Sequence, residues 1–128
     1  MMQRPVLALA AAAALISAGA AHAQSAGEVA KGKAVFTAQC SLCHSANAGQ
    51  EGAAPSLFGV VGRKAGSDPG FTAYTTAIKS SGKVWTRANL NTFLSGPAKF
   101  IPGTAMPITL ANPADREAVI AYLATLKR

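Results

Sequence analysis

The chain has 128 residues, with 12 lysines and arginines against 5 aspartates and glutamates and a formal net charge of +7. This length predicts a single small domain. The basic residues are scattered, without a stripe of basic and aromatic residues, so we do not expect a nucleic-acid-binding protein. A basic surface of this kind favours acidic protein partners, although most of the individual charges are expected simply to be solvated.

Residues 1–23 have the pattern of a secretory signal peptide. Arg4 supplies a positive start, residues 6–21 are apolar or small, and residues 21–23 read Ala-His-Ala, which fits cleavage before Gln24. An uncleaved membrane anchor is the alternative, which the short, alanine-rich run disfavours. Losing Arg4 lowers the 12 basic residues to 11 against 5 acidic ones, so the mature domain, residues 24–128, has a net charge of +6.

A first helix is predicted over residues 27–39, where Val29, Gly32 and Phe36 recur at helical spacing. Glycine inside a helix costs about 1 kcal/mol relative to alanine. Because Gly32 lies on the apolar face, we expect it to permit the close approach of another helix.

The helix leads into Cys40-Ser41-Leu42-Cys43-His44, the C-x-x-C-H spacing typical of covalent haem attachment. Two thiols on one helical turn can add to the two vinyl groups at one porphyrin edge. The next residue, His44, can then supply an imidazole nitrogen to the iron. The motif therefore predicts one covalently attached haem c.

Three other uses of these residues fit the sequence less well. A redox-active dithiol would follow a β-strand, and nothing before Cys40 reads as a strand. A zinc site would need four ligands, and the only other Cys or His is His22, which lies in the leader. A disulfide between thiols this close in sequence has poor geometry.

The middle of the chain is predicted to be mostly loop. Residues 46–54 are rich in Gly, Ala, Asn and Gln, and the glycines of residues 55–63 indicate a tightly turning chain. The Ser-Asp-Pro-Gly run at 67–70 predicts a turn. Residues 74–80 are expected to form one or two helical turns.

Two further helices are predicted. Thr86 can cap a helix over residues 87–95, which Gly96 and Pro97 would end. The last helix would begin after Asn112, with Pro113 in its first position and Asp115 near its positive end. The residues expected to face inward are Leu90, Phe93, Leu94, Val119, Tyr122, Leu123 and Leu126.

Residues 100–107 contain Pro102, Gly103 and Pro107 and are therefore predicted to form a loop. The loop is apolar and presents Met106, the best soft-ligand candidate in the mature chain. A methionine turned inward in such a loop needs a reason beyond filling space.

Together these residues resemble the class I cytochromes c, of the mitochondrial and bacterial cytochrome c2 kind. The resemblance runs from about residue 27 to residue 126. The motifs that carry it are Gly32, Phe36, the C-x-x-C-H motif, Pro55, Gly-Arg-Lys at 62–64, Pro-Gly-Phe at 69–71, Trp85, Ile-Pro-Gly-Thr at 101–104 and Met106. The resemblance implies an all-α fold in which the N- and C-terminal helices pack together around one haem.

The resemblance also implies a role for each site residue. Cys40 and Cys43 would form the thioethers, while His44 and Met106 would bind the iron. The Pro55 carbonyl would accept the other ring N–H of His44. The groups expected to hydrogen-bond the haem propionates are Arg63, Tyr74, Trp85 and Thr104. Trp85 as plain core, and Arg63 as a surface charge, remain the alternatives.

Several positions depart from the family pattern. Phe93 stands where a tyrosine is usual and Ile78 where an asparagine is usual, and Ala73 is an insertion before Tyr74. Most of the lysines that usually surround the haem edge are also missing. Gln39, Ala98 and Ala105 stand in three of those places, and Lys99 remains.

The expected function is single-haem electron transfer in the bacterial periplasm, without catalysis, because an iron with two protein ligands has no open site. The partners would be redox proteins, either membrane respiratory or photosynthetic complexes or a periplasmic dehydrogenase. We expect a monomer without stable membrane insertion. Two alternatives stay open: an electron-accepting subunit held on one dehydrogenase, and a peroxidase-like or ligand-sensing haem protein.

Overall fold

The computed structural model describes residue 13 and residues 25–128. Apart from residue 13, the expected leader 1–23 and the cleavage site before Gln24 lie outside the described residues. Within the described residues, no helix combines the length and the apolar character needed to cross a membrane.

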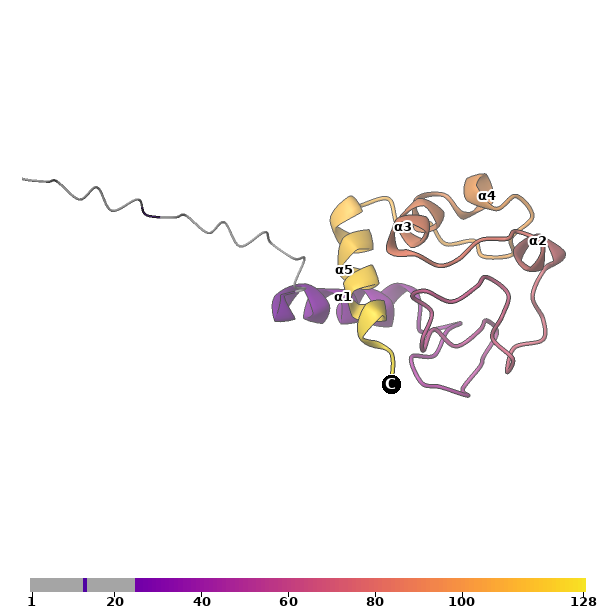
Figure 1. Ribbon diagram of the computed structural model, residues 1–128, viewed down its shortest axis with the longest axis horizontal. Helices are drawn as coiled ribbons and strands as arrows, with labels where there is room; N and C mark the ends of the chain where they lie inside the picture. The colour runs from indigo at the N-terminus through magenta and orange to yellow at the C-terminus, as the bar shows by residue number, and fades with distance from the viewer. Residues whose placement is uncertain (1–12, 14–24) are drawn as a thin grey trace, which may run out of the picture.

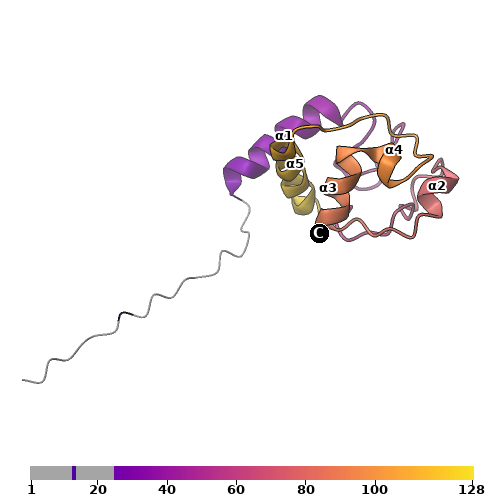
Figure 2. The ribbon, with the colours of Figure 1, turned by 90° about the horizontal axis from the view of Figure 1, so that it is seen from above.

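The described residues contain five helices, joined by loops, and no strand, which confirms the all-α prediction (Figure 1). Figures 1 and 2 show α1 and α5 crossing at one end of the molecule and α2 at the other end. The helices are α1 (Ala26–Gln39), α2 (Thr76–Lys79), α3 (Arg87–Ser95), α4 (Pro97–Phe100) and α5 (Pro113–Thr125).

Polar side chains fix where the three long helices begin. The Ser25 hydroxyl accepts a hydrogen bond from the Glu28 N–H at 3.1 Å, so α1 begins one residue earlier than predicted. Thr86 caps α3 by accepting from the Asn89 N–H at 3.1 Å, and the predicted bounds of this helix are confirmed. Asn112 caps α5 through the Ala114 N–H at 2.9 Å. Each cap satisfies a backbone donor that lacks a partner within its own helix.

The close contact between α1 and α5 depends on Gly32. A Cβ atom at Gly32 would overlap the carbonyl oxygen of Ala118 and would lie 2.8 Å from the Cβ of Tyr122. Next to it, the rings of Phe36 and Tyr122 pack with their centroids 5.5 Å apart. The expected helix pair is confirmed, with Ala118 and Tyr122 against Gly32, while Val119 faces the core and is 1% exposed.

Two local features were not predicted from the sequence. Residues Pro97–Phe100, between the predicted end of α3 and most of the predicted loop, form the short helix α4. In addition, Lys64 and Val84 form an isolated antiparallel bridge, flanked by hydrogen bonds of 2.8 Å from Gly62 N–H to Trp85 O and from Trp85 N–H to Arg63 O. This short ladder places Arg63 and Trp85 side by side.

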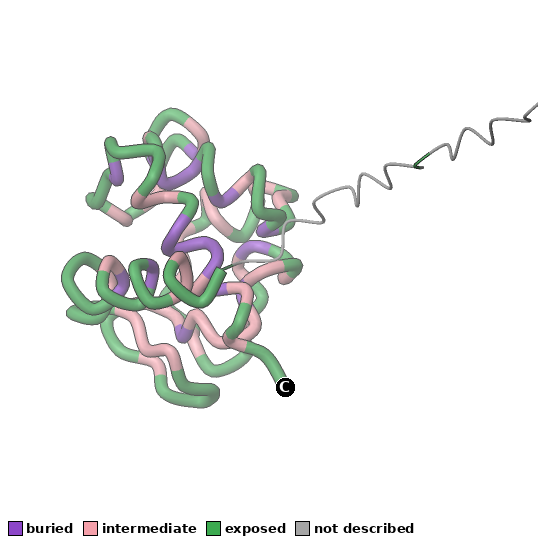
Figure 3. Tube along the Cα trace, turned by 90° about the vertical axis from the view of Figure 1, so that its left-hand side faces the viewer, coloured by how far each residue is buried: buried purple, intermediate pink, exposed green. Residues whose placement is uncertain are grey.

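The core lies between α1, α3, α5 and the loops that follow α1. Figure 3 shows the buried stretches inside the fold and exposed residues on the outer turns. The expected inward residues Leu90, Phe93 and Leu94 are all buried. The other large members of the core are Phe36, Val60, Trp85, Ile101, Leu110, Val119, Ile120 and Leu123.

Candidate functional site

A cavity of about 340 Å³ lies between the C-x-x-C-H motif, helix α3 and the segment around Met106. Its walls are largely apolar. All nine residues that the sequence singled out for the site line this one cavity: Cys40, Cys43, His44, Pro55, Arg63, Tyr74, Trp85, Thr104 and Met106. Ile78 and Phe93, which depart from the family pattern, line it as well.

The C-x-x-C-H motif continues the last turn of α1. The Cys40 N–H donates to Phe36 O at 2.8 Å, and the His44 N–H donates to Cys40 O at 2.9 Å. This turn keeps both thiols and the imidazole at one wall of the cavity. Burial raises the pKa of the Cys40 thiol to about 11, whereas Cys43 is exposed.

The imidazole of His44 has a defined orientation. Its Nδ1 atom lies 2.7 Å from the carbonyl oxygen of Pro55, 11 residues later in the chain. Since a carbonyl can only accept, Nδ1 carries the proton and Nε2 keeps a free lone pair. Desolvation lowers the pKa of His44, and Arg63 adds to this effect, while the Pro55 hydrogen bond opposes it. A neutral imidazole with a free Nε2 is the form that binds iron.

Met106 approaches the cavity from the loop after α4. It is half-buried and packs against the core cluster. Its N–H donates to the Thr104 hydroxyl at 3.3 Å, and the Thr104 N–H donates to Ile101 O at 3.1 Å. These turns hold the thioether beside the cavity while leaving the Thr104 O–H able to donate.

Arg63 is held within the fold rather than solvated as a surface charge. Its guanidinium donates to Phe58 O and to Ser56 O, each at 3.0 Å. Its Nε atom is buried and has no hydrogen-bond partner among the described residues. A buried N–H without an acceptor is costly, so this atom calls for an anionic or polar acceptor from a bound group.

Two aromatic residues stand near Arg63. The indole of Trp85 is 8% exposed and packs on Phe93 with ring centroids 4.9 Å apart. The Tyr74 hydroxyl accepts from the Asp68 N–H at 3.2 Å. Burial is the largest effect on Tyr74 and raises its pKa, so its O–H remains a donor.

One residue that supports the site could not be predicted from the sequence. Arg116, on α5, donates to Leu110 O at 2.8 Å, to Ala111 O at 3.0 Å and to Asn91 Oδ1 at 2.8 Å. These bonds fix the end of the loop that carries Met106. A lone arginine on an exposed helix face gives no signal of such a role in the sequence.

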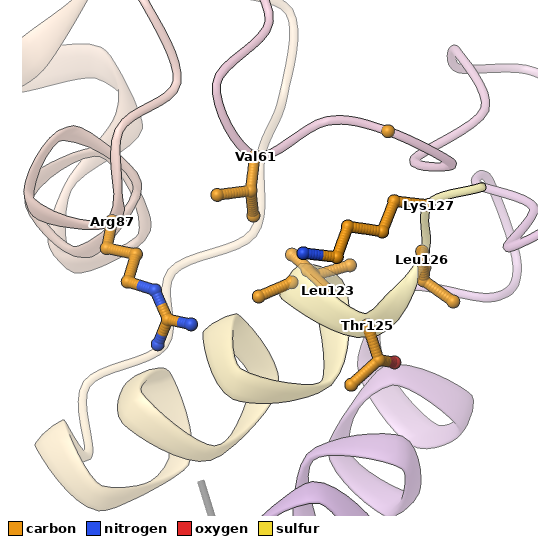
Figure 4. A pocket seen from close by; sticks show the side chains of 8 residues that line it. Val61, Arg87, Leu123, Thr125, Leu126 and Lys127 are labelled. Atoms are coloured by element: carbon orange, nitrogen blue, oxygen red, sulfur yellow. The ribbon is translucent and has the colours of Figure 1, made fainter. Parts of the chain in front are cut away.

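A second cavity of about 450 Å³ opens between residues 59–61, Arg87 and the end of α5 (Figure 4). Figure 4 shows the Arg87 and Lys127 side chains on either side of Val61 and Leu123. Its eight lining residues include no cysteine, histidine or methionine. It therefore offers no iron ligand, and the haem chemistry belongs to the first cavity.

The residues of the first cavity fit a haem. The two thiols lie on one turn at the wall, and the lining suits a large apolar ring. The unpartnered Nε of Arg63 suits a carboxylate of the kind that haem carries. One imidazole nitrogen and one thioether sulfur are available as iron ligands.

Comparisons with known proteins support the conclusion that the first cavity fits a haem. The family model "Cytochrome c" matches residues 29–127. Cytochrome c2 of Rhodomicrobium vannielii is 46% identical over 82% of this chain and 84% of its own length. Cytochrome c of Euglena viridis is 40% identical over 79% of this chain and 99% of its own length. The solved structure of cytochrome cH from Methylobacterium extorquens has a TM-score of 0.70 and 39% identity, and the match covers 76% of this chain and 97% of that one.

The family-model match spans nearly all of the described domain and includes the C-x-x-C-H motif and the whole of α5. The C-x-x-C spacing of Cys40 and Cys43 in a protein of this kind is consistent with covalent attachment of one haem c. The chain belongs to the cytochrome c family, a family of electron carriers rather than enzymes.

Proposed function

We propose that this protein carries single electrons between redox proteins of the periplasm, with His44 and Met106 as the two axial ligands of its haem iron. The observation that carries the proposal is the convergence of the C-x-x-C-H motif and Met106 on one largely apolar cavity. Haem supplies an iron that changes by one electron between its ferric and ferrous forms. Two protein ligands leave no iron position for a substrate.

The remaining residues of the site position these two ligands and the propionates. The Pro55 carbonyl orients His44, and the hydrogen bond to Thr104 helps to orient the Met106 loop. Arg63, Tyr74, Trp85 and Thr104 would donate hydrogen bonds to the propionates. The largely apolar wall excludes water, which keeps the change in solvation between the two oxidation states small.

The thioether side of the cavity provides the route for the electron. Cys43 and its neighbour Leu42 are exposed, so a partner can approach this edge closely. Trp85, by contrast, is buried, and Arg63 and Tyr74 are half-buried. Electron exchange would therefore occur at the edge beside Cys43 without any opening of the fold.

The periplasmic location rests on residues 1–23, read as a signal peptide that is cleaved before Gln24. Extraction of the protein from the periplasmic fraction and sequencing of its N-terminus test this part. A mature chain that begins at Gln24 is expected. A chain that retains Met1, or that stays in the cytoplasm, contradicts the proposed location.

The haem assignment is tested by the double variant Cys40→Ser/Cys43→Ser. Wild-type protein should keep haem in a denaturing gel, and the double variant should lose it. In a redox titration the wild type should show one reversible one-electron transition. Turnover of peroxide by the wild type would favour a catalytic haem protein instead. Purification in a fixed ratio with one dehydrogenase would favour the dedicated subunit.

A further inference from the structure

The mouth of the haem cavity is made of exposed, uncharged side chains. Leu42, between the two cysteines and directly before Cys43, is 92% exposed, and Ile108 is 37% exposed. We call the exposed cavity-lining residues the mouth patch; they are Gln39, Leu42, Cys43, Ala53, Ala73, Ala105, Pro107 and Ile108. A leucine exposed this fully, beside other apolar residues, indicates a contact surface.

No charged side chain belongs to the mouth patch. Among the described residues that line the cavity, Arg63 is the only one with a formal charge, and its guanidinium is held inward by Phe58 and Ser56. Exposed basic residues such as Lys64, Lys79 and Lys127 lie outside the cavity lining. Lys99, which stands in one of the places where the family carries a lysine near the haem edge, also lies outside the lining, so the exposed part of the lining itself carries no charge.

We infer that the mouth patch docks a redox protein whose own contact surface is apolar and uncharged. The inference rests on the proposed electron-carrier function and specifies the partner for that same edge. An acidic partner surface would lose its hydration here without gaining a cation in contact. An apolar surface would cover Leu42 and Ile108 and bring the two cofactors close together.

The inference predicts a local charge near zero at the electron-transfer edge, although the mature chain carries a net charge of +6, from 11 basic and 5 acidic residues. Charges farther than a screening length of roughly 10 Å at 0.1 M salt contribute little to an encounter. Rates of electron transfer should therefore depend only weakly on ionic strength.

Two small oxidants of opposite charge test this directly. Hexacyanoferrate(III) and tris(phenanthroline)cobalt(III) each take one electron from the ferrous protein, which becomes ferric as the probe is reduced. Between about 10 mM and 300 mM ionic strength, we expect both wild-type rates to change by less than about twofold. A steep fall for the anionic probe with a rise for the cationic probe would overturn the inference, because positive charge would then govern the edge.

Two matched variants show at which surface an added charge changes the rate of electron transfer. Val84 is 41% exposed but lies outside the cavity lining, so Val84→Lys is the control for Leu42→Lys. Leu42→Lys should raise the hexacyanoferrate(III) rate at low salt by about threefold or more and make it salt-dependent, and Val84→Lys should not. Equal effects of the two variants would contradict docking at the mouth patch.

If a second copy of the chain or a lipid surface occupied the mouth patch instead, sedimentation would give different results. The wild type should sediment as a monomer, both alone and with phosphatidylcholine vesicles. A dimer that Leu42→Lys dissociates would assign the patch to a second copy, and vesicle binding that this variant abolishes would assign it to lipid. Failure of the proposed function itself would look different, because the wild type would then bind carbon monoxide or turn over peroxide, whatever the salt dependence of the two oxidation rates.

Discussion

The Nδ1 atom of His44 lies 2.7 Å from the carbonyl oxygen of Pro55. The hydrogen bond spans 11 residues, so it ties the C-x-x-C-H motif to the loop that follows it. A hydrogen bond at Nδ1 makes the imidazole a stronger donor at Nε2, and a stronger donor stabilises ferric iron relative to ferrous iron. With His44 as the proposed iron ligand, the backbone around Pro55 would therefore influence the reduction potential.

Pro55→Gly frees this backbone and allows the carbonyl to turn away from His44. We expect the reduction potential to rise by a few tens of millivolts, which is less than the ~59 mV that corresponds to a tenfold change in a one-electron equilibrium. Pro69→Gly, in an exposed turn, is the control for the loss of proline alone. Redox titration measures both variants, and equal potentials for Pro55→Gly and the wild type would contradict this role.

The packing of α1 on α5 predicts opposite effects at two glycines of α1. Gly32→Ala places a Cβ against the Ala118 carbonyl and should lower the free energy of unfolding by about 1–3 kcal/mol. A Cβ at Gly27 would have no atom within 4 Å, so Gly27→Ala should raise the free energy of unfolding by up to about 1 kcal/mol through helix propensity. Denaturant unfolding compares them, and equal midpoints would show that the close helix contact is not required.

Arg116 fixes the end of the Met106 loop, so its loss should affect both stability and ligation. Arg116→Gln removes the bonds to the Leu110 and Ala111 carbonyls and should cost about 1–3 kcal/mol. Added imidazole should then displace Met106 from the ferric protein more readily. Asn91→Ala removes one acceptor and should have a smaller effect. If imidazole affinity is unchanged in Arg116→Gln, the arginine stabilises the fold without positioning Met106.

The helix boundaries could be predicted because their signals are local. Thr86 and Asn112 cap their helices as expected, since each bonds to an N–H only two or three residues away. The sequence does not reveal α4 because the Gly96-Pro97 pair is typical of a helix end, although proline also suits the first turn of a new helix. The pairing of Lys64 with Val84 was missed because it joins distant loop residues that have no strand pattern.

The site shows the same difference between local and long-range information. The attachment cysteines and His44 follow from spacing alone. The hydrogen bonds of Arg63 to Ser56 and Phe58, and those of Arg116, depend on how loops fold against one another. The contact of Gly32 with Ala118 depends on the exact crossing of two helices, which periodicity does not determine.

Ligation of the iron by both His44 and Met106 is the central claim, and carbon monoxide tests it most directly. The absorption spectrum of the ferrous wild type should not change when carbon monoxide is added, because both axial positions are occupied. Met106→Ala should keep its covalent haem, bind carbon monoxide and have a lower reduction potential. If the wild type binds carbon monoxide as readily as Met106→Ala does, Met106 is not an iron ligand and the electron-carrier account is contradicted.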